Sequence, residues 1–343
     1  MVDAICQEIR LQKNYLQDRT LDSIYFGGGT PSLLSEGHLE QLFHRIHEVF
    51  SPKPDCEITL EANPDDLTLD SSKLLLNAGV NRLSIGVQSF DDHVLKFLNR
   101  VHDGTMAQLA LENCRVAGFK NISIDLIYAI PNQDHALLEN NINKALAFAP
   151  EHFSAYSLTI EPKTVFGNWV NKEKIIPASE EFNAIQFEML SSRLATAGYE
   201  HYEISNFCRP GFFSKHNSSY WTQAEYLGVG PGAHSYNTQT RQFNIKNNAL
   251  YAKSIKLGQV PCEVEVLTKE NKINEYVFTT LRTSLGCNLE KIKKDFEFDI
   301  LDFYSKYIEN LVTNKLAVID NNILRLTFRG KLLADQIASD LMV

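Results

Sequence analysis

The first half of the chain alternates two kinds of segment, and this alternation limits the fold more than any other feature of the sequence. Short runs of β-branched and aromatic residues are separated by segments whose apolar residues recur at the period of an α-helix. One strand and one helix repeat about every 25–40 residues, which is typical of βα units around a parallel sheet. The runs are too apolar for strands with one face in water, so we expect helices to cover the sheet. The strand-like runs are "SIYFGGG", "CEITLEANP", "RLSIGVQSF", "NISIDLIYAIP" and "HFSAYSLTIEP".

The helical segments carry local signals for their ends. Ser35 and Asp91 stand where helix N-caps are expected, and Gly79 and Gly118 follow two expected helix ends. Two layouts fit the alternation, an open doubly wound sheet and a full or partial β/α barrel, and both place function at the carboxyl ends of the strands. The predicted helices cover residues 3–17, 37–50, 71–78, 91–98, 105–117, 137–148 and 179–197.

The second half of the chain has a different sequence pattern, which predicts separate structural parts. A loop-rich, aromatic stretch follows the helix expected at 179–197, and amphipathic helices begin near residue 265. Asp320, Asn321 and Asn322 mark the turn of a terminal hairpin, and helices before such a hairpin are typical of a small winged-helix-like domain. We therefore predict a partial β/α barrel at residues 1–170, a segment with the HNxxYW loop that completes the barrel and links onward at 171–264, and a C-terminal domain at 265–343.

Composition excludes several classes of partner. The 343 residues are 44% hydrophobic, which is enough for a sizeable core. The formal net charge of -9, without a cluster of Lys and Arg, argues against nucleic acid as the main partner. No apolar run is long enough to span a bilayer and none resembles a secretory signal, so we predict a cytoplasmic protein. The six cysteines are scattered without a CxxC pair, which favours reduced structural thiols over disulfides or a zinc site.

Three consecutive glycines end the first predicted strand, at Gly27, Gly28 and Gly29, and Thr30 follows them. One interpretation is a tight strand-to-helix turn. The other is close approach of the backbone to a ligand, which we favour because three glycines exceed what a turn needs. The string is neither GxGxxG nor a P-loop, and it has no P-loop lysine, so ordinary dinucleotide or nucleoside-triphosphate binding is not expected.

Polar residues also mark the ends of the other predicted strands. Glu61 ends the second strand, Gln88 the third, and Thr159 lies at the end of the fifth. Arg100, in the string "LNRVH", offers a guanidinium that can hold a carboxylate through two hydrogen bonds. Because the carboxyl ends of parallel strands meet at one rim, these residues predict a site for a polar, zwitterionic ligand.

Asp125 is the only charged residue inside the fourth strand-like run. A buried carboxylate needs a partner or its pKa shifts. One interpretation is a structural salt bridge to Arg82 or Arg100, and the other is a hydrogen bond to ligand hydroxyls in the mouth of the barrel.

The string "KHNSSYW" places His216 in a predicted loop among aromatic residues. One interpretation is a capped turn whose aromatic rings fill the core. The other is an imidazole ligand flanked by flat aromatic surface, which suits a haem. His201 and His234 are further candidates for such a ligand.

Together, these motifs resemble the oxygen-independent coproporphyrinogen III oxidase-like branch of the radical S-adenosylmethionine (SAM) superfamily. Within that branch, the HNxxYW pattern resembles the HemW-type haem chaperones. The resemblance extends from about residue 20 to 240, and the C-terminal segment follows the family more loosely. The motifs, in order, are "YFGGGTPS", "LEANP", "SIGVQSF", "LNRVH", "IDLIYAIP", "YEISNF", "HNSSYW" and "GVGPGAHS".

The resemblance implies a ligand for the rim and one for the histidine. It implies SAM at the strand ends, and haem, with a haem-accepting protein as partner, at His216. By the same resemblance, the Gly28–Thr30 backbone faces the methionine part of SAM, Glu61 and Arg100 its charged amino-acid groups, Gln88 and Asp125 its ribose side, and Thr159 the adenosine.

The chain departs from the family at its beginning. In relatives a first strand delivers a CxxxCxxC loop whose thiolates hold a [4Fe–4S] cluster, and that cluster binds SAM and supplies the electron that cleaves it. No such string precedes Gly27, and Cys6 lies in a predicted helix that matches the helix after the cluster loop. A truncated gene, a misassigned start and a natural loss each explain this. We predict that the chain as given does not cleave SAM, and that the strand at Ser23 is left as a sheet edge.

A second departure follows the Asp125 strand, in "YAIPNQ". Ala129 and Asn132 stand where relatives carry glycine, so we expect a stiffer loop here.

Three functions remain as hypotheses at this point. We favour a haem-binding or haem-delivering protein on a barrel without radical catalysis. The second is a fragment of an active coproporphyrinogen oxidase-like enzyme of porphyrin biosynthesis. The third is an unrelated β/α-barrel enzyme that uses Glu61 and Asp125 as an acid and base.

Overall fold

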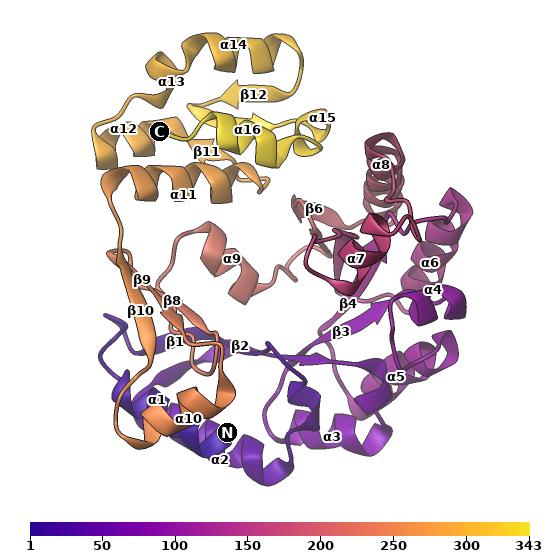
Figure 1. The fold of residues 1–343 in the computed structure, drawn as a ribbon, viewed down its shortest axis with the longest axis vertical. Helices are drawn as coiled ribbons and strands as arrows, with labels where there is room; N and C mark the ends of the chain where they lie inside the picture. The colour runs from indigo at the N-terminus through magenta and orange to yellow at the C-terminus, as the bar shows by residue number, and fades with distance from the viewer. The chain divides into compact units, whose positions relative to one another are not determined.

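The structure, a computed structural model, describes residues 1–343 in full (Figure 1). It divides into two compact units. The first unit comprises Met1–Ile24, Ser35–Glu57 and Lys215–Val343, and the second comprises Tyr25–Leu34 and Ile58–Ser214. The three parts expected at 1–170, 171–264 and 265–343 stay a prediction.

The main sheet has seven strands in the order β1-β2-β3-β4-β5-β7-β6. The first five follow chain order without the reversal that defines an open doubly wound sheet, so the partial β/α barrel is confirmed. The pairs β2–β3, β3–β4 and β4–β5 are parallel, whereas β7 runs antiparallel to both β5 and β6. The strands are β1 (Thr20–Phe26), β2 (Ser51–Ala62), β3 (Arg82–Gln88), β4 (Ile122–Tyr128), β5 (His152–Ser157), β6 (Glu200–Glu203) and β7 (Asn206–Cys208).

Helices cover this sheet, as its apolar strands predict. Six of the seven residues of β3 are buried, which requires cover on both faces. The expected cap at Asp91 is present, because its side chain accepts hydrogen bonds from the backbone of His93 and Val94. Gly118 ends its helix in the left-handed region, at φ 112°. The helices of the second unit are α3 (Leu69–Asn77), α4 (Asp92–Phe97), α5 (Gly104–Ala117), α6 (His135–Ala147), α7 (Val165–Asn171) and α8 (Glu180–Thr196), with short 3-10 turns at Pro31–Leu33 and Pro64–Asp66.

The first unit is held together in part by a buried carboxylate. Glu8 is fully buried and accepts hydrogen bonds from the Gly230 backbone at 2.7 Å, the Asn244 amide at 2.6 Å and the Tyr251 hydroxyl. Each donor lies more than 200 residues after Glu8 in the sequence, so these bonds pack the first helix against the later part of this unit. The elements here are α1 (Val2–Leu11), α2 (Glu36–Val49), α9 (Lys215–Trp221), β8 (His234–Tyr236), β9 (Thr240–Asn244), α10 (Asn248–Lys256) and β10 (Cys262–Val266).

Two expectations about this unit are wrong. The first helix ends at Leu11, well before the predicted residue 17, because the chain turns at Gln12, whose buried amide bonds to Glu8. The "KHNSSYW" string is the helix α9 and not a loop. Its seven residues are too few to predict a helix, and the bonds that hold it come from a strand about 160 residues earlier.

The C-terminal part of the first unit contains the expected hairpin followed by helices. Strands β12 and β13 pair antiparallel, and β11 joins β13 to complete a three-stranded sheet. Asn321 and Asn322 form the turn at φ 51° and 60°, a conformation that asparagine tolerates better than most residues. The elements are α11 (Lys269–Leu281), β11 (Cys287–Asn288), α12 (Leu289–Phe296), α13 (Ile300–Phe303), α14 (Ser305–Thr313), β12 (Ala317–Asp320), β13 (Ile323–Leu326), α15 (Phe328–Lys331) and α16 (Ala334–Asp340).

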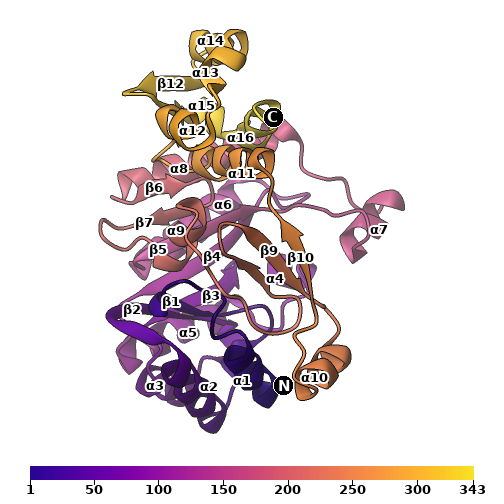
Figure 2. The same ribbon diagram turned by 90° about the vertical axis from the view of Figure 1, so that its left-hand side faces the viewer.

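None of the helices combines the length and the apolar composition that crossing a bilayer requires. One helix of the second unit differs from the others in its place, because Figure 2 shows α7 projecting beyond the helices that cover the sheet.

Candidate functional site

The glycine turn after β1 is built around the carboxylate of Glu61. A Cβ atom on Gly27 would lie 2.7 Å from the Tyr25 ring and 2.9 Å from the Glu61 carboxylate, so any side chain at Gly27 would displace both groups. Gly28 has φ +75°, which glycine adopts without strain. Gly29 has open space around it. The need for glycine at residues 27 and 28 is therefore explained by the chain itself, and Gly29 is the position where the turn leaves room.

Glu61, at the end of β2, is oriented by two donors from this turn. The Tyr25 hydroxyl donates to Oε1 at 2.8 Å, and the Gly28 backbone N–H donates to Oε2 at 3.2 Å. Burial and the nearby Glu61 carboxylate raise the pKa of Tyr25, so its hydroxyl keeps the proton that it donates. A carboxylate fixed beside the exposed backbone of Gly27–Thr30 can receive an ammonium group.

Arg100 lies at the ends of β2 and β3. Its Nη2 donates to the Asn63 side-chain oxygen at 2.7 Å and to the Gly86 carbonyl at 3.2 Å. Both bonds use Nη2, so Nε and Nη1 keep N–H donors for a carboxylate. A Cβ atom on Gly86 would lie 3.0 Å from the Gln88 amide and 3.3 Å from Arg100, which places both side chains against this glycine. Gln88 itself has φ 64°, an unusual conformation that directs the chain away from the strand.

Asp125 faces serine hydroxyls. Ser84 lies 3.1 Å from both carboxylate oxygens, and the Ser123 hydroxyl lies 3.4 Å from one of them. Burial raises the pKa of Asp125 to about 6, and the Ser84 hydrogen bond and the Arg82 charge lower it only in part. The carboxyl can therefore change protonation near neutral pH, and it can accept or donate a hydrogen bond to a ligand hydroxyl.

A chain of buried polar groups continues from Asp125 into the sheet. The Ser123 hydroxyl lies 2.8 Å from His152 Nδ1, and His152 Nε2 lies 2.7 Å from the Tyr202 hydroxyl. Burial lowers the pKa of His152 well below its ordinary value, so the ring stays neutral. The sequence pattern did not single out these groups or Tyr25. A signal was present, since Ser123 lies two residues before Asp125 and Tyr25 two before Gly27, each on the same face of its strand.

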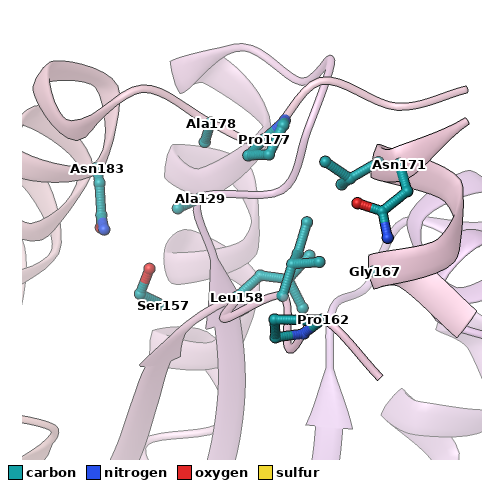
Figure 3. Close-up of a pocket in the computed structure, with 11 residues that line it drawn as sticks. Ala129, Ser157, Leu158, Pro162, Gly167, Asn171, Pro177, Ala178 and Asn183 are labelled. Atoms are coloured by element: carbon teal, nitrogen blue, oxygen red, sulfur yellow. The ribbon is translucent and has the colours of Figure 1, made fainter. Parts of the chain in front are cut away.

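Thr159 lies exposed just beyond the end of β5, and its two neighbours line a hollow of about 260 Å³ (Figure 3). Its lining combines aliphatic side chains with amide and hydroxyl groups, in about equal polar and apolar surface. Its lining residues are Ala129, Ser157, Leu158, Ile160, Pro162, Gly167, Val170, Asn171, Pro177, Ala178 and Asn183.

The loop after β4 contains two residues in a conformation that favours glycine. Ala129 has φ 56° and Asn132 has φ 59°. The Ala129 backbone N–H donates to the Gln186 side chain at 2.7 Å, which holds the residue in place. These are the two positions where the resemblance implies glycine, so the side chains here add strain to a turn that the fold still requires.

His216 belongs to the first unit, on the helix α9. Ser23 Oγ lies 3.2 Å from Nδ1 and the Tyr220 hydroxyl lies 3.0 Å from Nε2. The Tyr220 ring stands edge-on to the imidazole at 5.1 Å and to Tyr226 at 4.8 Å. Both ring nitrogens therefore have partners, and the half-buried ring lies among aromatic side chains.

The other two histidine candidates have roles that the fold explains. His201 Nε2 lies 3.0 Å from the Ile204 carbonyl, and its ring stacks on Phe207 at 4.1 Å. His234 lies in the short strand β8 with its ring edge-on to Phe243 at 4.8 Å. His216 is the candidate in a recognisable motif with an oxygen atom at each ring nitrogen.

The cysteines do not fit an iron–sulfur cluster. All six are free, and no three of the potential ligands His, Cys, Asp and Glu form a group that could hold a metal ion. Burial raises the pKa of Cys56 and Cys114 to about 11, and that of Cys208 and Cys287 to about 12. Cluster ligands are thiolates, which these surroundings disfavour.

Comparisons with known proteins agree with this architecture. The pattern of the radical SAM superfamily matches residues 6–145, and that of the HemN C-terminal domain matches residues 267–333. A protein of Bacillus subtilis (strain 168) named heme chaperone HemW is 38% identical over 319 residues, which cover 92% of this chain and 84% of the relative. The protein of the same name from Lactococcus lactis subsp. lactis (strain IL1403) is 37% identical over 329 residues, covering 96% and 86%.

A solved structure is similar across almost the whole chain. Coproporphyrinogen III oxidase (HemN) from Escherichia coli, a radical SAM enzyme, aligns with a TM-score of 0.83 over 99% of this chain and 82% of its own. The two sequences are 23% identical, so this likeness shows the fold alone.

Proposed function

This chain belongs to the HemW-type family of radical SAM proteins, and on that premise we propose that it binds haem through His216 and holds it for a haem-accepting protein. The observation that carries the proposal is the setting of His216. A serine hydroxyl lies at one ring nitrogen, a phenol at the other, and aromatic rings lie around them. In metal-binding histidines one ring nitrogen is commonly held by a neighbour, as Nδ1 of His216 is by Ser23, while the other nitrogen binds the metal.

We also propose that the ends of β1 to β5 bind SAM. Glu61 is placed to bind the ammonium group, Arg100 the carboxylate, and Asp125 a ribose hydroxyl. The charge pattern supports this, because a carboxylate and a guanidinium at neighbouring strand ends suit a zwitterion. The remaining proposed contacts are the Gly27–Thr30 backbone, Gln88, and Thr159 with the hollow beside it.

The proposed function does not include radical catalysis by these 343 residues. A [4Fe–4S] cluster, when bound, supplies the electron for cleaving SAM, and the buried, scattered thiols of this chain do not fit such a cluster. SAM bound here would act as a ligand that orders the strand ends. We propose the cytoplasm as the location, in keeping with a chain whose helices are not built to span a membrane.

Haem titration of the whole chain tests the first proposal. We expect a Soret band that shifts on binding and is lost or strongly weakened in His216→Ala, while His44→Ala, an exposed histidine on α2, leaves it unchanged. A His216→Ala variant with the same spectrum and affinity as the unmodified chain would show that haem binds elsewhere.

Calorimetry tests the proposed SAM site, and reconstitution tests the proposed lack of radical catalysis. SAM is expected to bind the unmodified chain and to bind Arg100→Ala at least tenfold more weakly, since a charge-assisted pair is worth about 1.5–3 kcal/mol. Equal affinities would remove Arg100 from the site. Anaerobic treatment with iron and sulfide is expected to give no stoichiometric cluster absorbance, and 5′-deoxyadenosine production would contradict that expectation.

A further inference from the structure

The helix that carries His216 is held at its first residues by a carboxylate from β2. Glu57 is 6% exposed, and its Oε2 and Oε1 accept hydrogen bonds from the backbone N–H groups of Lys215 at 2.9 Å and His216 at 3.0 Å. A helix of seven residues is too short to be stable alone, and its first N–H groups have no partner within it. The position of His216 is therefore set by Glu57.

A second contact from the same strand region strengthens this attachment. The Lys215 ammonium donates to the Asp55 carbonyl at 2.7 Å and pairs with its carboxylate at 2.6 Å. This ion pair is exposed and contributes little by itself. The buried carboxylate, two residues further along β2, is the stronger attachment, because its negative charge also faces the positive end of the helix.

The imidazole ring is oriented by one hydroxyl on each side. A neutral imidazole has one N–H donor and one acceptor nitrogen, so the two neighbours decide which nitrogen carries the proton. A phenol is a stronger acid than a serine hydroxyl and is the better donor. On this chemical ground Tyr220 is assigned as the donor to Nε2, and Ser23 as the acceptor from the Nδ1–H group. In this form Nε2 carries no hydrogen, so its lone pair makes Nε2 the ring nitrogen that can bind a metal.

We propose that Ser23 and Glu57 position His216 so that Nε2 is the iron-binding atom, and that the Tyr220 hydroxyl covers Nε2 until haem iron replaces it. This inference rests on the proposed haem function. In the exchange, the Tyr220 O–H···Nε2 hydrogen bond breaks and the Nε2 lone pair forms the bond to iron. The phenol proton stays on Tyr220, the Nδ1–H stays on His216, and no electron is transferred.

The packing of Tyr220 allows its hydroxyl to leave Nε2 while its ring stays in place. His216 and Tyr220 are four residues apart, so they share one face of α9. Tyr220 also packs edge-on against Tyr226, and this contact is independent of the hydroxyl. The HNxxYW spacing thus places the histidine and its competing hydroxyl on the same side of one helix.

Haem titrations of single variants of the whole chain test the inference. Tyr220→Phe keeps the ring and removes the competing hydrogen bond, so we expect haem to bind it about threefold to tenfold more tightly. Ser23→Ala is expected to bind about tenfold more weakly, and Ser23→Thr to recover most of that loss. Glu57→Gln leaves one helix N–H without its acceptor and is expected to weaken binding and speed hydrogen exchange at residues 215–221. Tyr307→Phe, which removes a hydroxyl bond in the C-terminal part, is the control and leaves affinity unchanged.

A haem-free measurement reads the proton position directly. In ¹⁵N-edited NMR of the apoprotein, we expect His216 as the Nδ1–H form in the unmodified chain and a mixture of both forms in Ser23→Ala. Suppose that Tyr220→Phe binds haem no more tightly than the unmodified chain, while His216→Ala loses haem. This result would overturn the proposed role of the Tyr220 hydroxyl and leave the proposed function standing. An Nε2–H form in the unmodified chain would do the same. Full haem binding by His216→Ala would overturn both.

Discussion

The strand-end site and the His216 site are assembled in different ways. At the strand ends, each side chain is held by near neighbours in the same rim, as Glu61 is by Tyr25 and Gly28. His216 depends on partners that lie far away in the chain, because Ser23 and Glu57 precede it by 193 and 159 residues. A site of the first kind tolerates local change poorly at its glycines. A site of the second kind depends on single distant contacts.

The buried carboxylates of the two sites also differ in their surroundings. Glu57 is a carboxylate satisfied by two backbone N–H groups, whereas Asp125 is held by serine hydroxyls and has its pKa raised by burial. The hydrogen bonds of Glu57 hold α9 in place, whereas burial makes Asp125 costly to ionise. Substitution of Glu57 should therefore lower the free energy of unfolding, and substitution of Asp125 should raise it.

The largest expected effect is the loss of the distant attachment of α9. Glu57→Ala leaves two partly buried N–H groups without their charged acceptor, and we expect the free energy of unfolding to fall by about 3 kcal/mol. Urea denaturation measures this, and Glu263→Ala, an exposed residue of β10, is the control with a change below about 0.5 kcal/mol. Equal effects for the two variants would mean that α9 is held by other contacts.

Asp125 is expected to give a pH-dependent effect of the opposite sign. Its folded pKa of about 6 lies above the value of 3.8 for an unperturbed carboxyl, so the folded state binds the proton more tightly. This contribution is present below the unfolded value and is lost as the pH rises through 6. Asp125→Asn should therefore gain stability over the unmodified chain with rising pH, by about 3 kcal/mol well above pH 6.

Denaturation curves of both proteins between pH 4 and 8 measure this difference. Ser84→Ala removes the hydrogen bond that lowers the pKa of Asp125, so in that background the rise should shift to higher pH. A stability difference that does not vary with pH would show that Asp125 is as well solvated when folded as when unfolded.

The glycine turn offers a matched pair within three residues. Gly27→Ala pushes a methyl group against Tyr25 and Glu61, and because those side chains can shift, we expect a loss of about 1–2 kcal/mol in the free energy of unfolding. It should also weaken SAM binding, since Glu61 moves. Gly29→Ala enters open space and should change stability by less than about 0.5 kcal/mol. Thermal melts and calorimetry compare them, and a larger effect at Gly29 would reverse the assignment of which glycine the chain itself requires.

Much of the fold could be predicted from the sequence because its signals are local. Strand runs, helix periods and caps such as Ser35 and Asp91 each lie within a few residues of the element they define. The rim residues followed from the rule that parallel strands end together. The helix α9 could not be predicted, because its length gives no periodic signal and its main attachment, Glu57, lies in another element. Nothing in the string "CEITLEANP" distinguishes Glu57, which holds a helix, from Glu61, which lies at the rim.

The smallest expected effect concerns the loop after β4, where two side chains occupy positions that favour glycine. Ala129 at φ 56° has a strained backbone, and Ala129→Gly removes that strain at the cost of greater unfolded-chain freedom and one buried methyl group. We expect the free energy of unfolding to rise by about 0.5 kcal/mol. Ala110→Gly in α5 is the control for sign, since glycine in a helix interior costs about 1 kcal/mol. Thermal melts of the two variants should therefore shift in opposite directions, and a loss of stability in Ala129→Gly similar to that in Ala110→Gly would show that the methyl group, and not the backbone conformation, governs this loop.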